Sequence, residues 1–137
     1  MARIVFGIEY DGSAFFGWQW QSHRRSIQNE VEQALAKVAN HPVTVVCAGR
    51  TDAGVHAVEQ VAHCDVNVER ELHAWLMGGN SNLPDEIRIT WVKYAVGDFH
   101  ARYSAIARLY RYVIINRSVK SALRNKQTTW CYQSLDV

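Results

Sequence analysis

The sequence contains few of the residues that mark disordered or disulfide-linked proteins. Only 2 of its 137 residues are proline and 48% are hydrophobic, which argues against a disordered chain and predicts one ordinary globular core. Its three cysteines, Cys47, Cys64 and Cys131, are widely spaced, odd in number and form no CxxC pair. This pattern argues against a disulfide framework and favours reduced, packed thiols.

Long apolar runs are also missing. No apolar run is long enough to cross a bilayer, and the first residues, Met1-Ala2-Arg3-Ile4, do not begin the hydrophobic segment of a secretory signal. We therefore expect a soluble, cytoplasmic protein that does not bind membranes.

Acidic residues are absent from the whole stretch between Asp98 and Asp136. Tyrosines are interleaved with the basic residues of this stretch, a combination that suits the phosphate backbone and unstacked bases of RNA. A solvated strand face followed by a flexible tail explains the pattern equally well, and the formal net charge of +2 favours neither interpretation. The basic residues are Arg102, Arg108, Arg111, Arg117, Lys120, Arg124 and Lys126.

The hydrophobic pattern predicts an α+β fold. Apolar residues alternate over residues 4–10, as in a strand, and recur at helical spacing from a candidate N-cap at Ser26 to Asn40. The element order is β-α-β-β-α-β, the ferredoxin-like or RRM-like pattern of an antiparallel sheet with helices on one face. The remaining elements are strands over residues 43–47, 58–66 and 87–94 and a helix over 69–77, which Gly78 and Gly79 would end.

Two further strands are predicted after this pattern, over residues 108–116 and 128–132. We expect residues 1–117 to form one α+β domain that carries the candidate catalytic loop. Residues 118–137 would then begin a connection to a C-terminal domain.

A glycine-flanked loop between two predicted strands holds the strongest candidate for catalysis. Arg50 and Asp52 lie two residues apart in it, and Gly49 and Gly54 permit backbone conformations that other residues avoid. Such a loop can hold the Asp52 carboxylate at the rim of a sheet, facing a cleft. The alternative is a structural turn in which Asp52 bonds its own backbone and pairs with Arg50, and the short motif alone favours that alternative.

A longer motif changes this balance. Gly49-Arg50-Thr51-Asp52-Ala53-Gly54-Val55-His56 resembles the active-site motif of the tRNA pseudouridine synthase A family. Further segments match the same family in order, so that the resemblance extends from about residue 4 to residue 116. These segments are Glu9-Tyr10-Asp11-Gly12, Gly17-Trp18-Gln19, Ser26-Ile27-Gln28, Asn80 with Leu83-Pro84, Phe99-His100-Ala101-Arg102 and Arg108-Leu109-Tyr110-Arg111-Tyr112.

The resemblance implies the N-terminal domain of the pseudouridine synthase fold and a reaction on RNA. The family isomerises uridine to pseudouridine in the anticodon stem-loop of tRNA, at positions 38 to 40, without a cofactor and as a homodimer. It implies that Asp52 is the catalytic aspartate, that Arg50 displaces the target base and that Tyr110 stacks on the uracil. Because the family has a second domain, we expect this chain to be the N-terminal half and to be nearly inactive alone.

These residue types suit the chemistry. A carboxylate can attack the sugar or the base, or remove a proton at C2′, and the sequence does not choose among these roles. A planar guanidinium can fill the space that a flipped uridine leaves, and a tyrosine ring can stack on uracil. Without the resemblance, Tyr110 would be assigned to the core. Candidate phosphate contacts, each equally suited to an exposed surface, are Arg24, Arg25, Lys93, Arg108 and Arg111.

The sequence is also compatible with two other functions. A metal site could combine His56, His63, Asp65 and His100, but none of them has the short paired spacing typical of zinc ligands, and we expect no metal. A non-catalytic RNA-binding module also suits the RRM-like element order. The sequence contains no aromatic-rich RNP1-type segment, however, and such a module has no need of Asp52.

Overall fold

The computed structural model describes residues 1–136. The chain divides into two compact units, Met1–Ile106 and Ala107–Val137, and each is described by itself. Among the described residues, no helix combines the length and the hydrophobicity that crossing a membrane requires.

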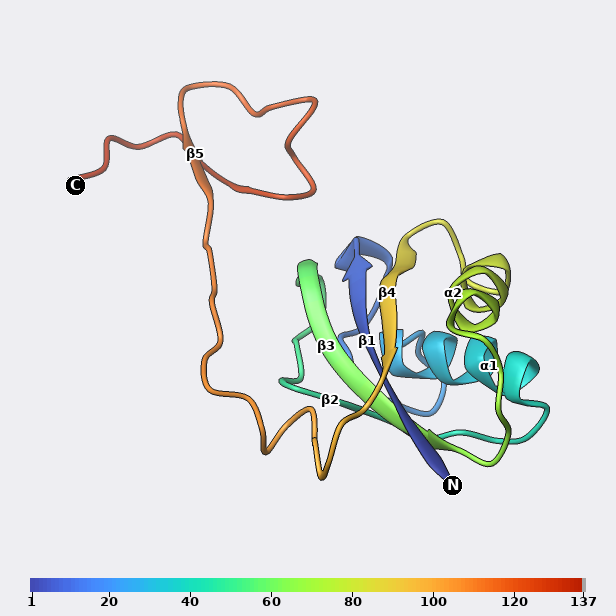
Figure 1. Ribbon diagram of the computed structural model, residues 1–137. Coiled ribbons are helices and arrows are strands. Elements are labelled where there is room, and N and C mark those ends of the chain that lie inside the picture. Colours follow the sequence, from blue (N-terminus) through green and yellow to red (C-terminus); the bar gives the residue numbers. More distant parts are fainter. Residues whose placement is uncertain (137) are drawn as a thin grey trace. The chain divides into compact units, whose positions relative to one another are not determined.

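The first unit is a four-stranded antiparallel sheet with both helices on one face (Figure 1). The strand order is β2-β3-β1-β4, so β1 and β3 lie at the centre of the sheet. The predicted α+β class and the predicted β-α-β-β-α-β order are therefore confirmed. The elements are β1 (Ala2–Tyr10), the 3-10 helix η1 (Gly12–Ala14), α1 (Ile27–Ala39), β2 (Val45–Cys47), β3 (Ala57–Val66), α2 (Leu72–Ser81) and β4 (Ile87–Tyr94).

The core lies between the sheet and the helices. Alternate side chains of β1, namely Ile4, Phe6 and Ile8, are fully buried and belong to the same cluster as Val31 and Leu35 of α1. Burying an apolar side chain of this size contributes roughly 1.5–3 kcal/mol, so the alternation in β1 and the stripe on α1 determine which faces meet.

Helix α1 has the predicted ends. The Ser26 hydroxyl oxygen accepts a hydrogen bond from the Asn29 backbone N–H at 3.2 Å, which satisfies one of the unpaired donors in the first turn. At the other end, Asn40 adopts the left-handed conformation with φ of 59°, a conformation that asparagine tolerates better than most residues.

The predicted bounds of α2 are wrong, because the helix starts later than residue 69 and continues through Gly78 and Gly79 instead of ending at them. Both glycines face close neighbours. A Cβ atom on Gly78 would lie 3.0 Å from a methyl group of Val38, and one on Gly79 would lie 2.9 Å from a methyl group of Ile89. The glycines therefore allow α2 to pack closely against α1 and β4, a tertiary contact that overrides their low helix propensity.

The segment after β4 covers part of the sheet face that lies opposite the helices. The Ala101 backbone N–H donates a hydrogen bond to Nδ1 of His63 at 3.0 Å. Arg3 donates to the Phe99 carbonyl oxygen at 2.8 Å and forms an ion pair with Asp65 at 2.8 Å. Only 3% of His63 is exposed as a result.

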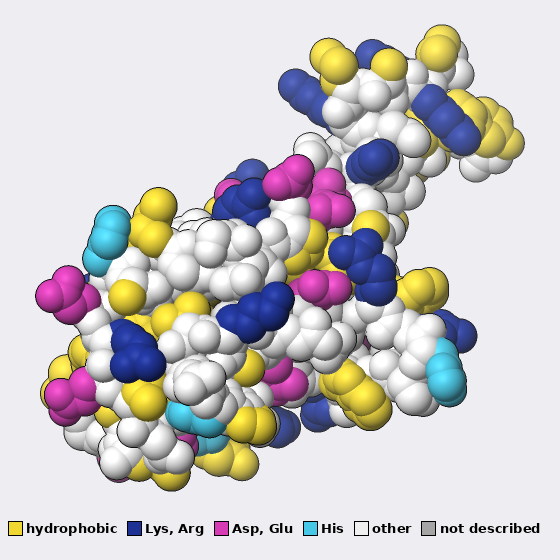
Figure 2. Space-filling view, turned by 90° about the vertical axis from the view of Figure 1, so that its right-hand side faces the viewer, with side chains coloured by type: hydrophobic (Ala, Val, Ile, Leu, Met, Phe, Trp, Pro, Cys, Tyr) yellow, Lys and Arg dark blue, Asp and Glu magenta, His cyan; other side chains and the backbone are white. Residues whose placement is uncertain are grey.

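The second unit is small and contains one pair of short parallel strands, β5 (Ile114–Asn116) and β6 (Thr129–Cys131). The strand predicted near residue 130 is confirmed as β6. The strand predicted over residues 108–116 is wrong for its first six residues, which have no regular structure. A strand needs a partner, and in the described part of this stretch only β5 has one. On the face shown in Figure 2, this unit presents basic and hydrophobic side chains.

Candidate active site

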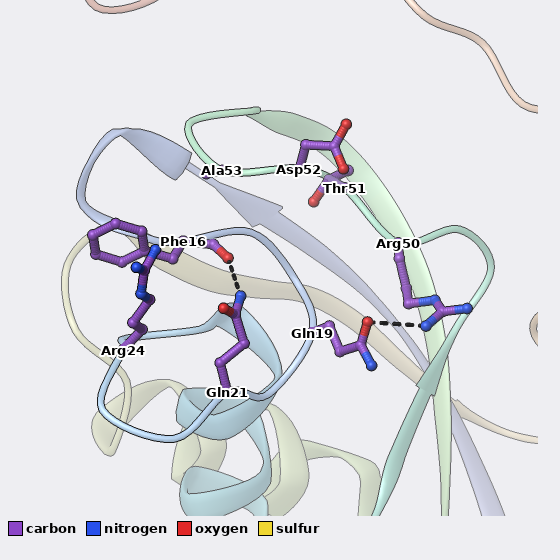
Figure 3. Close-up of a pocket in the computed structure, with 8 residues that line it drawn as sticks. All are labelled: Phe16, Gln19, Gln21, Arg24, Arg50, Thr51, Asp52 and Ala53. Atoms are coloured by element: carbon purple, nitrogen blue, oxygen red, sulfur yellow. Dashed lines mark hydrogen bonds between the residues drawn. The ribbon is translucent and has the colours of Figure 1, made fainter.

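A pocket of about 390 Å³ lies where the loop between β1 and α1 meets the loop between β2 and β3 (Figure 3). The two loops emerge side by side because Tyr10, at the end of β1, pairs with Ala57, at the start of β3. The β2–β3 loop contributes Arg50, Thr51, Asp52 and Ala53 to the lining. The β1–α1 loop contributes Phe16, Gln19, Gln21 and Arg24.

The two loops are joined through their backbones. The Trp18 N–H donates to the Thr51 carbonyl oxygen at 2.9 Å, and the Gly54 N–H donates to the Phe15 carbonyl oxygen at 3.3 Å. Gly17 has φ of +86°, and a Cβ atom there would lie 2.7 Å from the Thr51 carbonyl oxygen. Only glycine meets both requirements at this position, so the residue fixes how closely the loops approach.

A buried polar network supports the β2–β3 loop from the sheet. Gln60 of β3 is 7% exposed; its Oε1 accepts from the Gly49 N–H at 3.3 Å, and its Nε2 donates to the Gly49 carbonyl oxygen. The same Nε2 lies 3.4 Å from the Tyr10 hydroxyl, which is itself hydrogen-bonded to the Thr51 hydroxyl at 2.8 Å. This network holds Gly49 and Thr51, the residues on both sides of Arg50, and thereby fixes the backbone that leads to Asp52.

Asp52 is exposed on the β2–β3 loop. Its backbone carbonyl closes a turn by accepting from the Val55 N–H at 3.1 Å, but its carboxylate makes no hydrogen bond or ion pair with any residue from 1 to 136. The alternative of a structural turn held by the Asp52 side chain is therefore wrong. The backbone alone holds the turn, and the carboxylate is left available for chemistry.

Arg50 does not pair with Asp52. Its Nη1 donates to Oε1 of Gln19 at 2.9 Å, and this hydrogen bond spans the pocket from one loop to the other. In Figure 3 the Arg50 guanidinium and the Asp52 carboxylate point in different directions. Both side chains are exposed, so each can meet a ligand independently.

Arg24 and Arg25 occupy different environments, although the sequence predicted the same role for both. The Arg24 guanidinium lies 4.8 Å from the centre of the Phe16 ring and lines the pocket. The Arg25 guanidinium lies 4.6 Å from the centre of the Phe15 ring and forms an ion pair with Glu30 at 3.6 Å. Arg24 is therefore placed at the pocket rim, whereas the charge of Arg25 is already compensated.

The remaining predicted site residues are not part of the pocket lining. The Lys93 ammonium lies 5.7 Å from the Trp91 ring on β4. Tyr110, Arg108 and Arg111 belong to the second unit. Their predicted roles remain predictions.

The histidines that could have formed a metal site have other partners. Nδ1 of His56 accepts from the Gly12 N–H at 3.0 Å, and Nδ1 of His100 accepts from the Arg102 N–H at 3.1 Å. The His63 and His100 rings meet edge to face with their centres 4.6 Å apart. In the described part of the chain, no three His, Cys, Asp or Glu side chains gather as metal ligands would.

The sequence assigned no role to four pocket residues, Phe16, Gln19, Gln21 and Thr51, or to Gln60, which supports the β2–β3 loop. Gln60 carried a signal, because it shares a strand face with the apolar residues Ala62 and Cys64, and a polar side chain buried on that face needs a partner. Gln19 lies in a segment that matched the family, but its partner Arg50 is 31 residues away, and nothing in the sequence indicates that contact.

Comparison with known proteins places this arrangement in a family. A family model described as tRNA pseudouridine synthase matches residues 8–104. The tRNA pseudouridine synthase A of Methylococcus capsulatus is 61% identical over 135 residues, which cover 98% of this chain and 50% of the relative. The enzymes of the same name from Coxiella burnetii and Alcanivorax borkumensis are 57% and 56% identical, with coverage of 99% and 100% of this chain and 52% of each relative.

The chain thus spans about half the length of the curated relatives that it matches. The matched stretch contains both pocket loops and most of the sheet that holds them. On that basis, the chain belongs to the tRNA pseudouridine synthase family.

Proposed function

We propose that this chain is the N-terminal half of a tRNA pseudouridine synthase that isomerises uridine to pseudouridine in the anticodon stem-loop, at positions 38 to 40. The observation that carries the proposal is an exposed Asp52 carboxylate, unpaired within residues 1–136, in a pocket that also contains Arg50. The full-length protein is proposed to be a cytoplasmic homodimer that needs no cofactor.

The reaction requires a carboxylate that is accessible to the substrate. The bond between N1 of uracil and C1′ of ribose breaks, the base turns over, and a bond forms between C5 and C1′. The proton on C5 is lost, and N1 gains one, so the reaction is an isomerisation. Asp52 can act as the nucleophile or as the base at C2′ without first breaking a hydrogen bond of its own.

Arg50 suits the second requirement, which is to keep the target uridine out of its stack. Unstacking a base costs a few kcal/mol, and a guanidinium placed in the vacated space can stack and bond phosphate groups there. Arg50 must leave Gln19 to do so, which costs one exposed hydrogen bond. Such a bond contributes only about 0.5–1.5 kcal/mol, so the exchange is favourable once RNA is bound.

Tyr110 is proposed as the residue that stacks on the target uracil. The residue is 69% exposed and lies outside any strand, which leaves its ring available for stacking and does not support a core role. Base–aromatic stacking contributes about 1–3 kcal/mol per base.

Release of tritium from C5 of the target uracil tests the proposal. The full-length protein is expected to release tritium from tRNA labelled at uracil C5, and its Asp52→Asn variant to release none while still binding tRNA. Asp98→Asn, which changes another exposed carboxylate, is the matched control and should not alter the rate. If the parent protein binds tRNA but releases no tritium, a non-catalytic RNA-binding module becomes the better account.

The 137-residue chain should also be assayed alone. We expect weak binding of tRNA and little or no tritium release, because the family's second domain supplies the other wall of the cleft. A rate equal to that of the full-length protein would contradict the proposed division of the site.

A further inference from the structure

We propose that Phe16 and Arg24 form a second base-binding site in the pocket, which takes the base of a nucleotide next to the target uridine in the anticodon stem-loop. The ligand is a nucleobase together with its phosphate. This inference rests on the proposed function, since it requires RNA in the pocket.

Phe16 is an exposed ring on a fixed backbone. Its N–H donates to the Arg25 carbonyl oxygen at 2.9 Å, and its carbonyl oxygen accepts from Nε2 of Gln21 at 2.9 Å. The preceding side chain, Phe15, is 3% exposed and anchors the loop in the core, whereas Phe16 is 46% exposed. Because the backbone is held in this way, little backbone freedom is lost when a base stacks on the ring.

Arg24 adds a flat cation to this ring. Its guanidinium carbon lies 4.8 Å from the ring centre, within the range of a cation–π contact. No carboxylate lies within ion-pair distance of Arg24 among residues 1–136, whereas the neighbouring Arg25 is paired with Glu30. Arg24 therefore offers an uncompensated charge to a phosphate and a planar group to a base, as RNA-binding arginines do.

The position of the pair identifies which base it would meet. Phe16 and Arg24 lie on one side of the pocket and Arg50 on the other, with Gln19 and Gln21 between them (Figure 3). A base on the pair and a uridine at Asp52 would therefore share one cavity of about 390 Å³. Two neighbouring nucleotides of one strand can supply bases at this separation, and we therefore assign the second base to a neighbour of the target.

A cycle of protein and RNA changes tests the pair directly. The dissociation constant is measured for the full-length protein and its Phe16→Ala variant, using an anticodon stem-loop RNA and copies with an abasic nucleotide on the 5′ or the 3′ side of the target. One abasic copy should weaken binding to the parent roughly tenfold. In Phe16→Ala the same abasic change should cost less than about twofold, because the stacking partner is already gone.

Three further variants make the result specific. Phe16→Tyr retains a ring and should show the full abasic effect, while Arg24→Lys retains charge without the plane and should show a reduced one. Trp20→Ala is the control, since Trp20 is 55% exposed in the same loop but does not line the pocket. Its abasic effect should equal that of the parent.

Equal abasic losses in the parent and in Phe16→Ala would overturn the proposed pair. Tritium release from the unmodified RNA separates this failure from a failure of the proposed function. Release together with equal losses rejects only the second base site. A non-additive cycle without release would support base binding at Phe16 and reject the enzymatic proposal.

Discussion

The side-chain amide of Gln60 bonds both backbone polar groups of Gly49, accepting from its N–H and donating to its carbonyl oxygen. Gly49 lies just beyond the end of β2, where strand pairing has stopped. The Gln60 side chain provides the hydrogen bonds that a neighbouring strand would otherwise make to its backbone. The contact fixes the start of the loop that carries Arg50 and Asp52, so Gln60 is a positioning residue in the proposed reaction.

Replacing Gln60 tests this role. Gln60→Leu removes the side chain that bonds both Gly49 groups and one of the partners of the Tyr10 hydroxyl, which should lower the free energy of unfolding by about 1–3 kcal/mol. In the full-length protein, kcat should fall at least tenfold while the dissociation constant for tRNA changes less than twofold. Urea unfolding and single-turnover kinetics measure the two effects.

Gln33→Leu is the matched control for Gln60→Leu. Gln33 is exposed on α1, and its side chain makes just one hydrogen bond within residues 1–136, to Asn29 at 3.5 Å, so its replacement should change the free energy of unfolding by less than about 0.5 kcal/mol. An unchanged kcat in a folded Gln60→Leu protein would show that the network does not position the loop.

Gly17→Ala and Gly97→Ala separate backbone strain from loop displacement. Both glycines have positive φ, +86° and +64°, so alanine at either costs about 1–2 kcal/mol of conformational energy. A Cβ atom on Gly97 would meet nothing within 4 Å, whereas one on Gly17 would push against Thr51. We expect Gly97→Ala to reduce thermal stability alone, and Gly17→Ala to reduce stability further and to lower kcat. Equal effects on kcat would contradict this.

The stability of the first unit should depend on pH through His63. Burial, followed by the nearby charges of Arg3 and His100, lowers the pKa of His63 to about 4 in the folded chain. In the unfolded chain the pKa is about 6.5. Between these values the unfolded state binds a proton that the folded state does not, so the free energy of unfolding should fall on acidification from about pH 6.5 to 4, by on the order of 3 kcal/mol.

His63→Asn provides the comparison, because asparagine offers an acceptor to the Ala101 N–H but does not titrate. Urea unfolding at several pH values should show a smaller slope for the variant than for the parent in this window. Identical slopes would exclude His63 as the source.

Ser26→Ala should lower the free energy of unfolding by about 1 kcal/mol, because it removes the side-chain acceptor for the Asn29 N–H at the start of α1. Ser22→Ala, in the exposed part of the preceding loop, is the control and should be neutral. Thermal unfolding of both variants measures the difference. A loss confined to Ser22→Ala would show that α1 is not capped as described.

The features that the sequence predicted well are those set by neighbouring residues. The alternation in β1, the stripe on α1 and the cap at Ser26 are local patterns, and the motif around Asp52 identified its loop. Contacts between distant segments were not predictable. Gly78 and Gly79 favoured a helix end until their neighbours Val38 and Ile89 were known.

The strand over residues 108–116 failed for a related reason. Its alternation is compatible with a sheet, but pairing depends on a partner. Among the second unit's described residues, only β6 provides one, for Ile114–Asn116. At the pocket, the motif indicated Arg50 and Asp52. Phe16 and Gln19, on the opposite side, are distant in sequence and come close to these residues only in the folded chain, so their place in the pocket was not predictable.

The hydrogen bond between Arg50 and Gln19 bears on how fast the site can engage its substrate. Within the described residues, this is the one hydrogen bond that holds the guanidinium, and both side chains are exposed. Breaking it requires rotation of side chains, which takes picoseconds to nanoseconds, and no movement of the loop backbone. Repositioning of the Arg50 side chain should therefore be far faster than turnover. The loop backbone should already have its bound conformation when RNA arrives.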